Sequence, residues 1–281
     1  PSATDIRSTQ MVRLTPPTLA NPSPSDNYPL YIIHHPLSMT LTYDIHELTP
    51  YINWVYFFYA WQVKDQEEKT RLRQEAETFL TQQEGRYHAY GLFELYEAYG
   101  DGDDIVVCKG VRSQETGACR IPCLRQQQGE PPYHCLSDFI FPLSISTDSC
   151  LPPPDSSKLG VFATSTDIGL ETDFDADPYQ KMMAQLLADR LAEAAAERMH
   201  EQVRKEYWGY AKDEQLTIPE MLIEKFQGIR PAVGYPSLPD TSLNFVLDEL
   251  IDMKQIGIRL TERGAMKPHA SVKAKIGRAV P

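Results

Sequence analysis

The sequence predicts an α+β fold with an antiparallel or mixed sheet. Strand-like and helix-like patterns are interspersed along the 281 residues, which is typical of this class. Residues 90–96 and 105–108 have the pattern of two strands, and the turn Gly100-Asp-Gly-Asp-Asp104 joins them. Strands joined in this way form a hairpin, which pairs them antiparallel.

The first third of the chain is expected to hold a linker, a short strand and a surface helix. Residues 1–37 include seven prolines among Ser, Thr and Asn, which predicts an extended arm or linker before one domain over residues 38–281. Residues 39–43 alternate like a strand, and residues 51–61 are dense in aromatic side chains that favour a core or an interface. Residues 64–83 are predicted to form a helix, since four apolar residues recur at helical spacing: Leu72, Ala76, Phe79 and Leu80.

The later elements are predicted from apolar periodicity and from helix-end signals. Residues 158–164 have the pattern of a buried strand, and residues 178–207 that of the longest helix, with Pro178 in its first turn. The run from Thr217 to Glu220 has the spacing of a capping box, which opens a helix to about Phe226. Residues 243–255 are predicted to be a helix that ends near Gly257, and residues 258–261 a late strand.

Charge and composition narrow the function classes. A net charge of −12 and a pI of about 5.1 argue against nucleic acid and anionic membranes as partners. No apolar run approaches the length of a membrane span and no secretory signal is visible, so we expect a cytoplasmic protein. Five cysteines without a CxxC pair favour reduced thiols. A metal cluster of Cys119, Cys123, His134 and Cys135 is the alternative, but it lacks zinc-ribbon spacing, and we expect no metal.

The most informative segment is Gly228-Ile-Arg-Pro-Ala-Val-Gly-Tyr-Pro236. Pro231 and Pro236 restrict the backbone and remove N–H donors, whereas Gly234 permits conformations closed to other residues. Arg230 presents a planar guanidinium that suits a carboxylate. These residues predict a rigid loop that holds a small zwitterion. The alternative is an arginine that serves only as a surface or ion-pair residue.

A second candidate lies on the long predicted helix. Glu193 has small alanines beside it, so another element can approach and the carboxylate can face a ligand's ammonium group; a solvated helix face is the alternative. His200 and His269 have no visible Ser or Cys partner and are expected to be solvated or satisfied. The chain shows no P-loop, GxGxxG, GxSxG or acid–base pair, so we assign no catalytic residue. Any catalysis is expected to act by proximity and orientation.

Three runs of residues resemble a known family. They are Ala188-Asp-Arg-Leu-Ala-Glu-Ala194, His200-Glu-Gln-Val-Arg-Lys-Glu-Tyr-Trp-Gly-Tyr-Ala211 and Gln227-Gly-Ile-Arg-Pro-Ala-Val-Gly-Tyr-Pro236, and Tyr51-Ile-Asn-Trp54 is a fainter match. These runs resemble the C-terminal activation domain of cobalamin-dependent methionine synthase. The resemblance implies a twisted antiparallel sheet with flanking helices in a C-shaped body. It also implies a module that binds S-adenosylmethionine and uses it to methylate cob(I)alamin, after a flavodoxin-type donor has returned one electron to the oxidised cofactor.

The resemblance also implies residue roles. Arg230 would take the methionine carboxylate, and Glu193 would face the ammonium or the sulfonium side. The backbone of four loop residues would hold the adenine and ribose edges: Pro231, Ala232, Gly234 and Tyr235. Because the methyl donor is activated by its positive sulfur, and because the cobalt of a partner's cobalamin is the nucleophile, no general base is needed.

The chain departs from the family pattern at two places. Asn53 stands where the family has an aspartate that contacts the ligand, so a hydrogen-bonding group is kept but the attraction for a cation is lost. After Val272 the family continues with a Gly-aromatic-Tyr strand and a helix, whereas this chain reads Lys273-Ala-Lys-Ile-Gly277 and on to Pro281. We therefore expect the closing strand and its tyrosine contact to be missing.

Several interpretations stay open at this point. The chain can be a fragment or a free-standing subunit of a synthase. It can instead be a non-catalytic interaction module that docks a corrinoid protein without using S-adenosylmethionine. A small-molecule sensor without a corrinoid link is the third.

Overall fold

The computed structural model describes residues 38–108, 118–140, 142 and 157–277, so the predicted arm over residues 1–37 lies outside it. The strands are β1 (Ser38–Tyr43), β2 (Ala89–Asp101), β3 (Asp104–Cys108), β4 (Ala118–Pro122), β5 (Ser157–Thr166), β6 (Arg259–Leu260), β7 (Met266–Lys267) and β8 (Ser271–Gly277). The α-helices are α1 (Ile45–Leu48), α2 (Trp54–Ala60), α3 (Gln66–Gln83), α4 (Gly169–Thr172), α5 (Pro178–Gln202), α6 (Ile218–Leu222) and α7 (Leu243–Ile251). Tighter or wider helical turns are η1 (Thr49–Tyr51), η2 (Leu136–Phe139), the π-helix η3 (Val203–Tyr207) and η4 (Met253–Ile256).

All strand pairs of the main sheet are antiparallel, which confirms the predicted class. The order is β4-β3-β2-β5-β8, and β1 also pairs with β2. The long strand β2 is central: its first half runs between β1 and β5, and its second half runs between β3 and β5. The predicted hairpin is β2–β3, with Asp101 opposite Asp104 at the turn.

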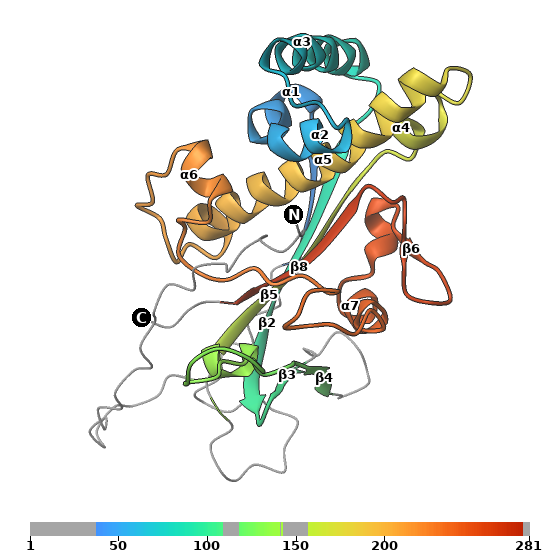
Figure 1. Ribbon diagram of the computed structural model, residues 1–281. Coiled ribbons are helices and arrows are strands. Elements are labelled where there is room, and N and C mark those ends of the chain that lie inside the picture. The colour runs from blue at the N-terminus through green and yellow to red at the C-terminus, as the bar shows by residue number, and fades with distance from the viewer. Residues whose placement is uncertain (1–37, 109–117, 141, 143–156, 278–281) are drawn as a thin grey trace.

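Helix α5 crosses one face of this sheet (Figure 1). It begins after Asp177, whose carboxylate accepts a hydrogen bond from the Tyr179 amide at 2.9 Å. Gly91 of β2 allows the close approach, because a Cβ built there would lie 1.9 Å from Met199 Cε. The Thr164 hydroxyl of β5 donates to the Ala192 carbonyl at 2.9 Å and fixes the helix along the sheet.

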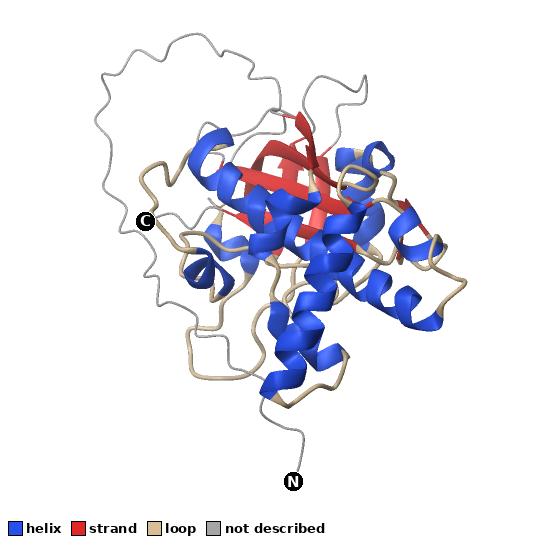
Figure 2. Ribbon diagram, turned by 90° about the horizontal axis from the view of Figure 1, so that it is seen from above, coloured by secondary structure: helices blue, strands red, loops and turns tan. Residues whose placement is uncertain are grey.

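The opposite face of the sheet is covered by α7 and η4. Leu92, Val161 and Ala163 pack there with apolar residues of these helical turns, and the Ser165 hydroxyl donates to the Ile256 carbonyl at 2.6 Å. Because both faces are covered, β5 is buried on both sides, and this explains its continuous apolar run. Figure 2 shows the strands gathered in one body that is flanked by helices.

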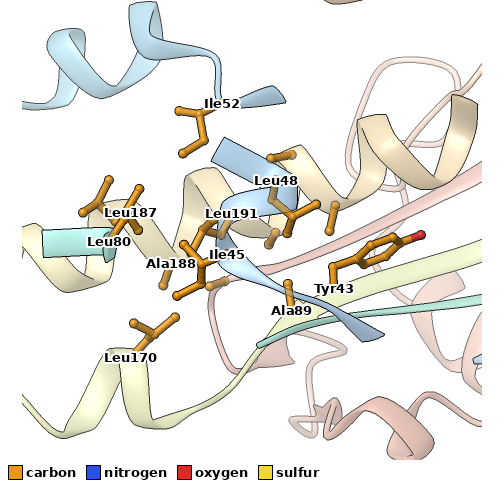
Figure 3. Packing of buried hydrophobic residues seen from close by; sticks show 14 of the residues in the cluster. Tyr43, Ile45, Leu48, Ile52, Leu80, Ala89, Leu170, Leu187, Ala188 and Leu191 are labelled. Carbon is orange, nitrogen blue, oxygen red and sulfur yellow. The ribbon is translucent and has the colours of Figure 1, made fainter. Parts of the chain in front are cut away.

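The N-terminal helices pack against α5 and not against the sheet alone. Ile45 and Leu48 of α1 are buried with Leu187 and Leu191 of α5, as Figure 3 shows. Helix α3 adds the four apolar residues expected from its helical spacing, all of them buried. The aromatic segment 51–61 is divided between environments, since Phe57 is buried whereas the other face of α2 is exposed.

Two predicted helices end earlier than expected. Helix α6 has the predicted capping box but ends at Leu222 and not near Phe226, because Glu224 adopts a left-handed φ of +60°. The helix predicted over residues 243–255 ends at Ile251, where Asp252 has a φ of +47° and a separate turn, η4, begins. The strands β4 and β7 have no counterpart in the pattern-based prediction.

The described part of the chain holds four cysteines and one group of candidate metal ligands. Cys108, Cys119, Cys123 and Cys135 are not joined in disulfides, while Cys150 lies outside the described residues. The groups placed closely enough to share a metal ion in these ranges are Asp44, His46 and Glu84, all exposed, and not the cysteine cluster considered above. None of the described helices is both long and apolar enough to span a bilayer.

Candidate functional site

Helix α5 carries a row of carboxylates at intervals of one turn. Asp189, Glu193 and Glu197 are spaced by four residues, so they share one face of the helix. Arg190 Nη1 lies 2.7 Å from Glu193 Oε2 and balances one of these charges. Burial raises the pKa of Glu193 above its ordinary value, while Arg190 opposes the shift and the neighbouring carboxylates add to it. Burial also raises the pKa of Asp189.

The Gly228–Pro236 loop brings Arg230 to the same face of α5. One Nη2 hydrogen of Arg230 is donated to Glu197 Oε1, and Nη1 lies 3.4 Å from the Ala196 carbonyl. Both side chains of the ion pair are mostly buried, at 15% and 16% exposed. The structure therefore places Arg230 beside Glu197, which is one turn of α5 from Glu193, although Arg230 and Glu193 are 37 positions apart in the chain. A guanidinium has five N–H donors, so these two contacts leave it able to bind a further carboxylate.

A second layer of residues, formed by Phe226, Arg204 and Glu214, supports Arg230. The Phe226 ring lies against Arg230 at 5.7 Å and against the buried Arg204 at 4.6 Å, measured from each guanidinium carbon to the ring centre. Arg204 in turn makes a bidentate pair with Glu214, with its closest contact at 2.6 Å. This layer was not predicted, because residues 204, 214 and 226 share no sequence motif.

His200 belongs to the same layer and not to a catalytic pair. It is fully buried, its ring is nearly perpendicular to the Phe226 ring with the ring centres 4.6 Å apart, and its Nε2 lies 3.4 Å from the Tyr210 hydroxyl. Burial, together with the nearby Arg230 and Arg204 charges, lowers the pKa of His200 well below its ordinary value. The imidazole is therefore neutral and acts as a packing element. The Nε2 atom has a hydrogen-bond partner, as expected of a satisfied histidine. The Nδ1 atom has no hydrogen-bond partner in the described residues.

The loop backbone is held by its own hydrogen bonds. The Gly234 amide donates to the Leu238 carbonyl at 2.8 Å, and the Leu238 amide donates to the Tyr235 carbonyl at 2.8 Å. Gly234 has a φ of +95°, and no atom would lie within 4 Å of an added Cβ, so glycine is required there by conformation and not by crowding. The Tyr235 side chain is 65% exposed, which leaves it available to a ligand or partner.

Asn53 caps the helix next to the site. Its Oδ1 accepts a hydrogen bond from the Val55 amide at 3.2 Å, so it serves as the N-cap of α2. Helix α2 lies beside α5, and the guanidinium of Arg190 on α5 sits 5.7 Å from the ring centre of Tyr56 on α2. Among the described contacts, none joins Asn53 directly to Glu193 or Arg230. Its predicted role toward a ligand stays a prediction.

Two comparisons with known proteins bear on the family of this chain. The family model described as "Vitamin B12 dependent methionine synthase, activation domain" matches residues 44–278. The chain belongs to this family. It is also similar to a crystal structure of the MetH reactivation domain bound to AdoHcy, with 32% sequence identity and a TM-score of 0.77 over 88% of this chain and 80% of that chain.

One expectation about this activation domain is wrong. The closing strand after Val272 was expected to be missing, yet β8 (Ser271–Gly277) pairs with β5 along its length and completes the edge of the sheet. Backbone pairing needs no particular side chains, so a strand forms although the sequence lacks the Gly-aromatic-Tyr pattern. What the chain lacks over residues 271–277 is the tyrosine itself.

Proposed function

We propose that this activation domain binds S-adenosylmethionine beside α5 and presents its methyl group to cob(I)alamin carried by a partner. The observation that supports this most directly is the placement of a cation, Arg230, and an anion, Glu193, on one helix face. Glu197, which pairs with Arg230, lies one helical turn from Glu193, a rise of roughly 6 Å along α5. The amino-acid part of the ligand carries a carboxylate and an ammonium group on one carbon, so it matches a pair of this kind. The similar domain of known structure binds AdoHcy, which has the same two groups.

In this proposal each loop and helix residue has a distinct task. Arg230 takes the ligand carboxylate in a charge-assisted pair, and Glu197 keeps the guanidinium in place. Glu193 attracts the ammonium or sulfonium side. The backbone of Pro231, Ala232, Gly234 and Tyr235 follows the nucleoside, and Asn53 offers its side-chain amide from the start of α2.

The chemistry that this chain must supply is orientation. The S–CH₃ bond breaks as the methyl group is transferred, the sulfonium becomes a neutral thioether, and no proton changes hands. Reduced cobalamin supplies the nucleophile when the partner presents it. Holding the sulfonium in line with that nucleophile is an effect of proximity, for which binding residues suffice.

The partners in this proposal are a cobalamin-binding domain or protein of methionine synthase and a flavodoxin-type electron donor. We place the reaction in the cytoplasm, where cysteines that form no disulfide, like those described in this chain, are usual. Whether the chain acts as part of a synthase or as a separate subunit does not change the roles of the residues.

Isothermal titration calorimetry with S-adenosylmethionine tests the proposal. Arg230→Ala is expected to cost about 1.5–3 kcal/mol, or roughly tenfold or more in affinity. Arg120→Ala is a matched control, because it removes an exposed ion-paired arginine from β4. The double variant Arg230→Ala/Glu197→Gln leaves no unpaired carboxylate behind. It is expected to lose binding as well, and its loss cannot come from the destabilisation that an unpaired carboxylate would cause. Absence of binding by the wild type, or equal binding by wild type and Arg230→Ala, would refute the proposal.

A second function is favoured by one feature of the site. Arg230 is already paired with Glu197, and the side-chain oxygen Oδ1 of Asn53 caps helix α2, so both candidate groups have structural roles. The chain would then dock a corrinoid protein without using S-adenosylmethionine. In that case a cobalamin-binding domain of methionine synthase co-purifies with wild type and with Arg230→Ala alike, and calorimetry with S-adenosylmethionine shows no heat.

A further inference from the structure

Positive charge in this acidic chain is concentrated near one end of the sequence. Residues 253–281 hold seven of the 27 Lys and Arg residues but one of the 39 Asp and Glu residues. This segment therefore carries a net charge of +6 within a chain of net charge −12. Such segregation of charge is typical of a surface that meets an oppositely charged partner.

The described part of this segment forms a small basic hairpin, which we define as Arg259, Arg263 and Lys267. Arg259 of β6 and Lys267 of β7 are register partners, so two cations stand directly opposite each other. Directly opposed like charges destabilise a pair of strands. Arg263 lies in the connecting turn, which is closed by the Thr261 amide donating to the Ala265 carbonyl at 2.8 Å. The opposed cations Arg259 and Lys267 therefore lower the free energy of unfolding, and an anionic partner would offset their repulsion.

The basic hairpin is open to solvent. All three cations are exposed, and none of them takes part in the ion pairs found among the described residues. Glu262 lies beside Arg263 in the turn and is the acidic residue of the hairpin segment. In Figure 1 the hairpin lies at the right of the view, whereas α6 lies at the left, so this surface is apart from the α6 side of the molecule.

An exposed aromatic ring adjoins the basic hairpin. Asn244 of α7 donates from Nδ2 to the Gly264 carbonyl at 2.7 Å, which fixes the turn against this helix. The next residue, Phe245, is 44% exposed, and a Cβ built on Gly264 would lie 3.3 Å from its ring. Aromatic and arginine side chains are enriched at protein–protein interfaces.

We propose that the basic hairpin, together with Phe245, is a docking surface for a protein that presents a cluster of carboxylates. A folded or peptide partner is favoured over lipid or nucleic acid for two reasons. The whole chain is strongly acidic, so an extended polyanion is repelled beyond a small local patch. The patch also combines cations with an exposed aromatic ring, which suits a compact protein contact. This docking surface is independent of the proposed binding of S-adenosylmethionine.

Fluorescence anisotropy with a short labelled hexaglutamate peptide as the probe, at low salt, tests the docking surface on the full chain. The variant Arg259→Glu/Arg263→Glu is expected to weaken binding roughly tenfold or more. The control Lys64→Glu/Arg71→Glu changes the net charge equally on exposed residues near and on α3, and it is expected to change binding less than about threefold. Phe245→Ser is expected to weaken binding as well, because the aromatic ring belongs to the contact.

Several results would overturn this inference. One is no binding of the hexaglutamate peptide by the wild type. Another is an equal loss in both double variants, which would show a response to net charge alone. Tighter binding to phosphatidylserine vesicles or to duplex DNA than to the hexaglutamate peptide would assign the surface to lipid or nucleic acid instead. Arg259→Glu/Arg263→Glu is expected to bind S-adenosylmethionine with the same affinity as the wild type in calorimetry. This measurement therefore separates failure of this inference from failure of the proposed function.

Discussion

Arg230 and Arg259 occupy opposite electrostatic surroundings in the same molecule. Arg230 lies mostly buried against Glu197, and the layer below it pairs Arg204 with Glu214. Arg259 is exposed and stands opposite a second cation, Lys267. A buried charge must be paired because desolvation is expensive, whereas an exposed charge is tolerated without a partner because water screens it. The paired region is therefore expected to matter for stability, and the unpaired hairpin mainly for recognition.

The most severe way to break the paired region is to remove Arg204. Arg204→Met leaves Glu214 with little solvent exposure and no partner, so we expect a loss of about 3–5 kcal/mol in the free energy of unfolding. Urea unfolding followed by circular dichroism measures this loss. The double variant Arg204→Met/Glu214→Leu is expected to recover most of it. A loss below about 1 kcal/mol in the single variant would contradict the argument.

Direct comparison of the two arginines gives the next largest effect. Arg230→Ala leaves Glu197 mostly buried and unpaired, so it is expected to cost about 1–3 kcal/mol of unfolding free energy. Arg259→Ala removes an exposed cation and is expected to stay within about 0.5 kcal/mol of wild type. Both values come from the same unfolding experiment. Equal effects of the two substitutions would remove the contrast between buried and exposed sites.

The pH dependence of ligand binding sharpens the role assigned to the paired region. Burial raises the pKa of Glu193, so this carboxyl takes up its proton at a higher pH than an ordinary glutamate. The charged form is the one that attracts a cation, and the affinity for S-adenosylmethionine is therefore expected to fall as the pH drops through this raised pKa. Calorimetry across a series of pH values measures the fall. Glu193→Gln is expected to bind more weakly near neutral pH and to lack this transition, and an unchanged transition would assign it to another group.

The smallest expected effect concerns the exposed hairpin. Arg259→Glu places a carboxylate opposite Lys267, so unfolding free energy is expected to rise by about 0.2–1 kcal/mol at low salt. Added salt should screen the gain away. Arg259→Glu/Lys267→Glu restores a like-charge pair and is expected to lose it. Destabilisation by Arg259→Glu alone would show that the arginine supports the fold.

Local sequence patterns predicted much of the fold. The capping box at Thr217 and the apolar spacing of residues 72–80 act within a few residues of each other, and the structure confirms both elements. The ends of two helices were predicted less accurately, because Glu224 and Asp252 adopt a left-handed conformation that their residue types do not signal as glycine would. The strand β8 was missed because pairing with β5 depends on backbone groups and not on the expected side chains.

For the candidate site, the sequence by itself determined the chemical groups: a guanidinium in a loop restricted by two prolines and a glycine, and a carboxylate on a helix lined with alanines. It also determined the family, which the comparisons confirm. Only the tertiary structure decided that Arg230 meets Glu197, that Phe226, His200 and Arg204 support it, and that Arg259 faces Lys267. The physical reason is that charge pairing and burial depend on distances between residues remote in the chain, and local periodicity carries no information about those distances.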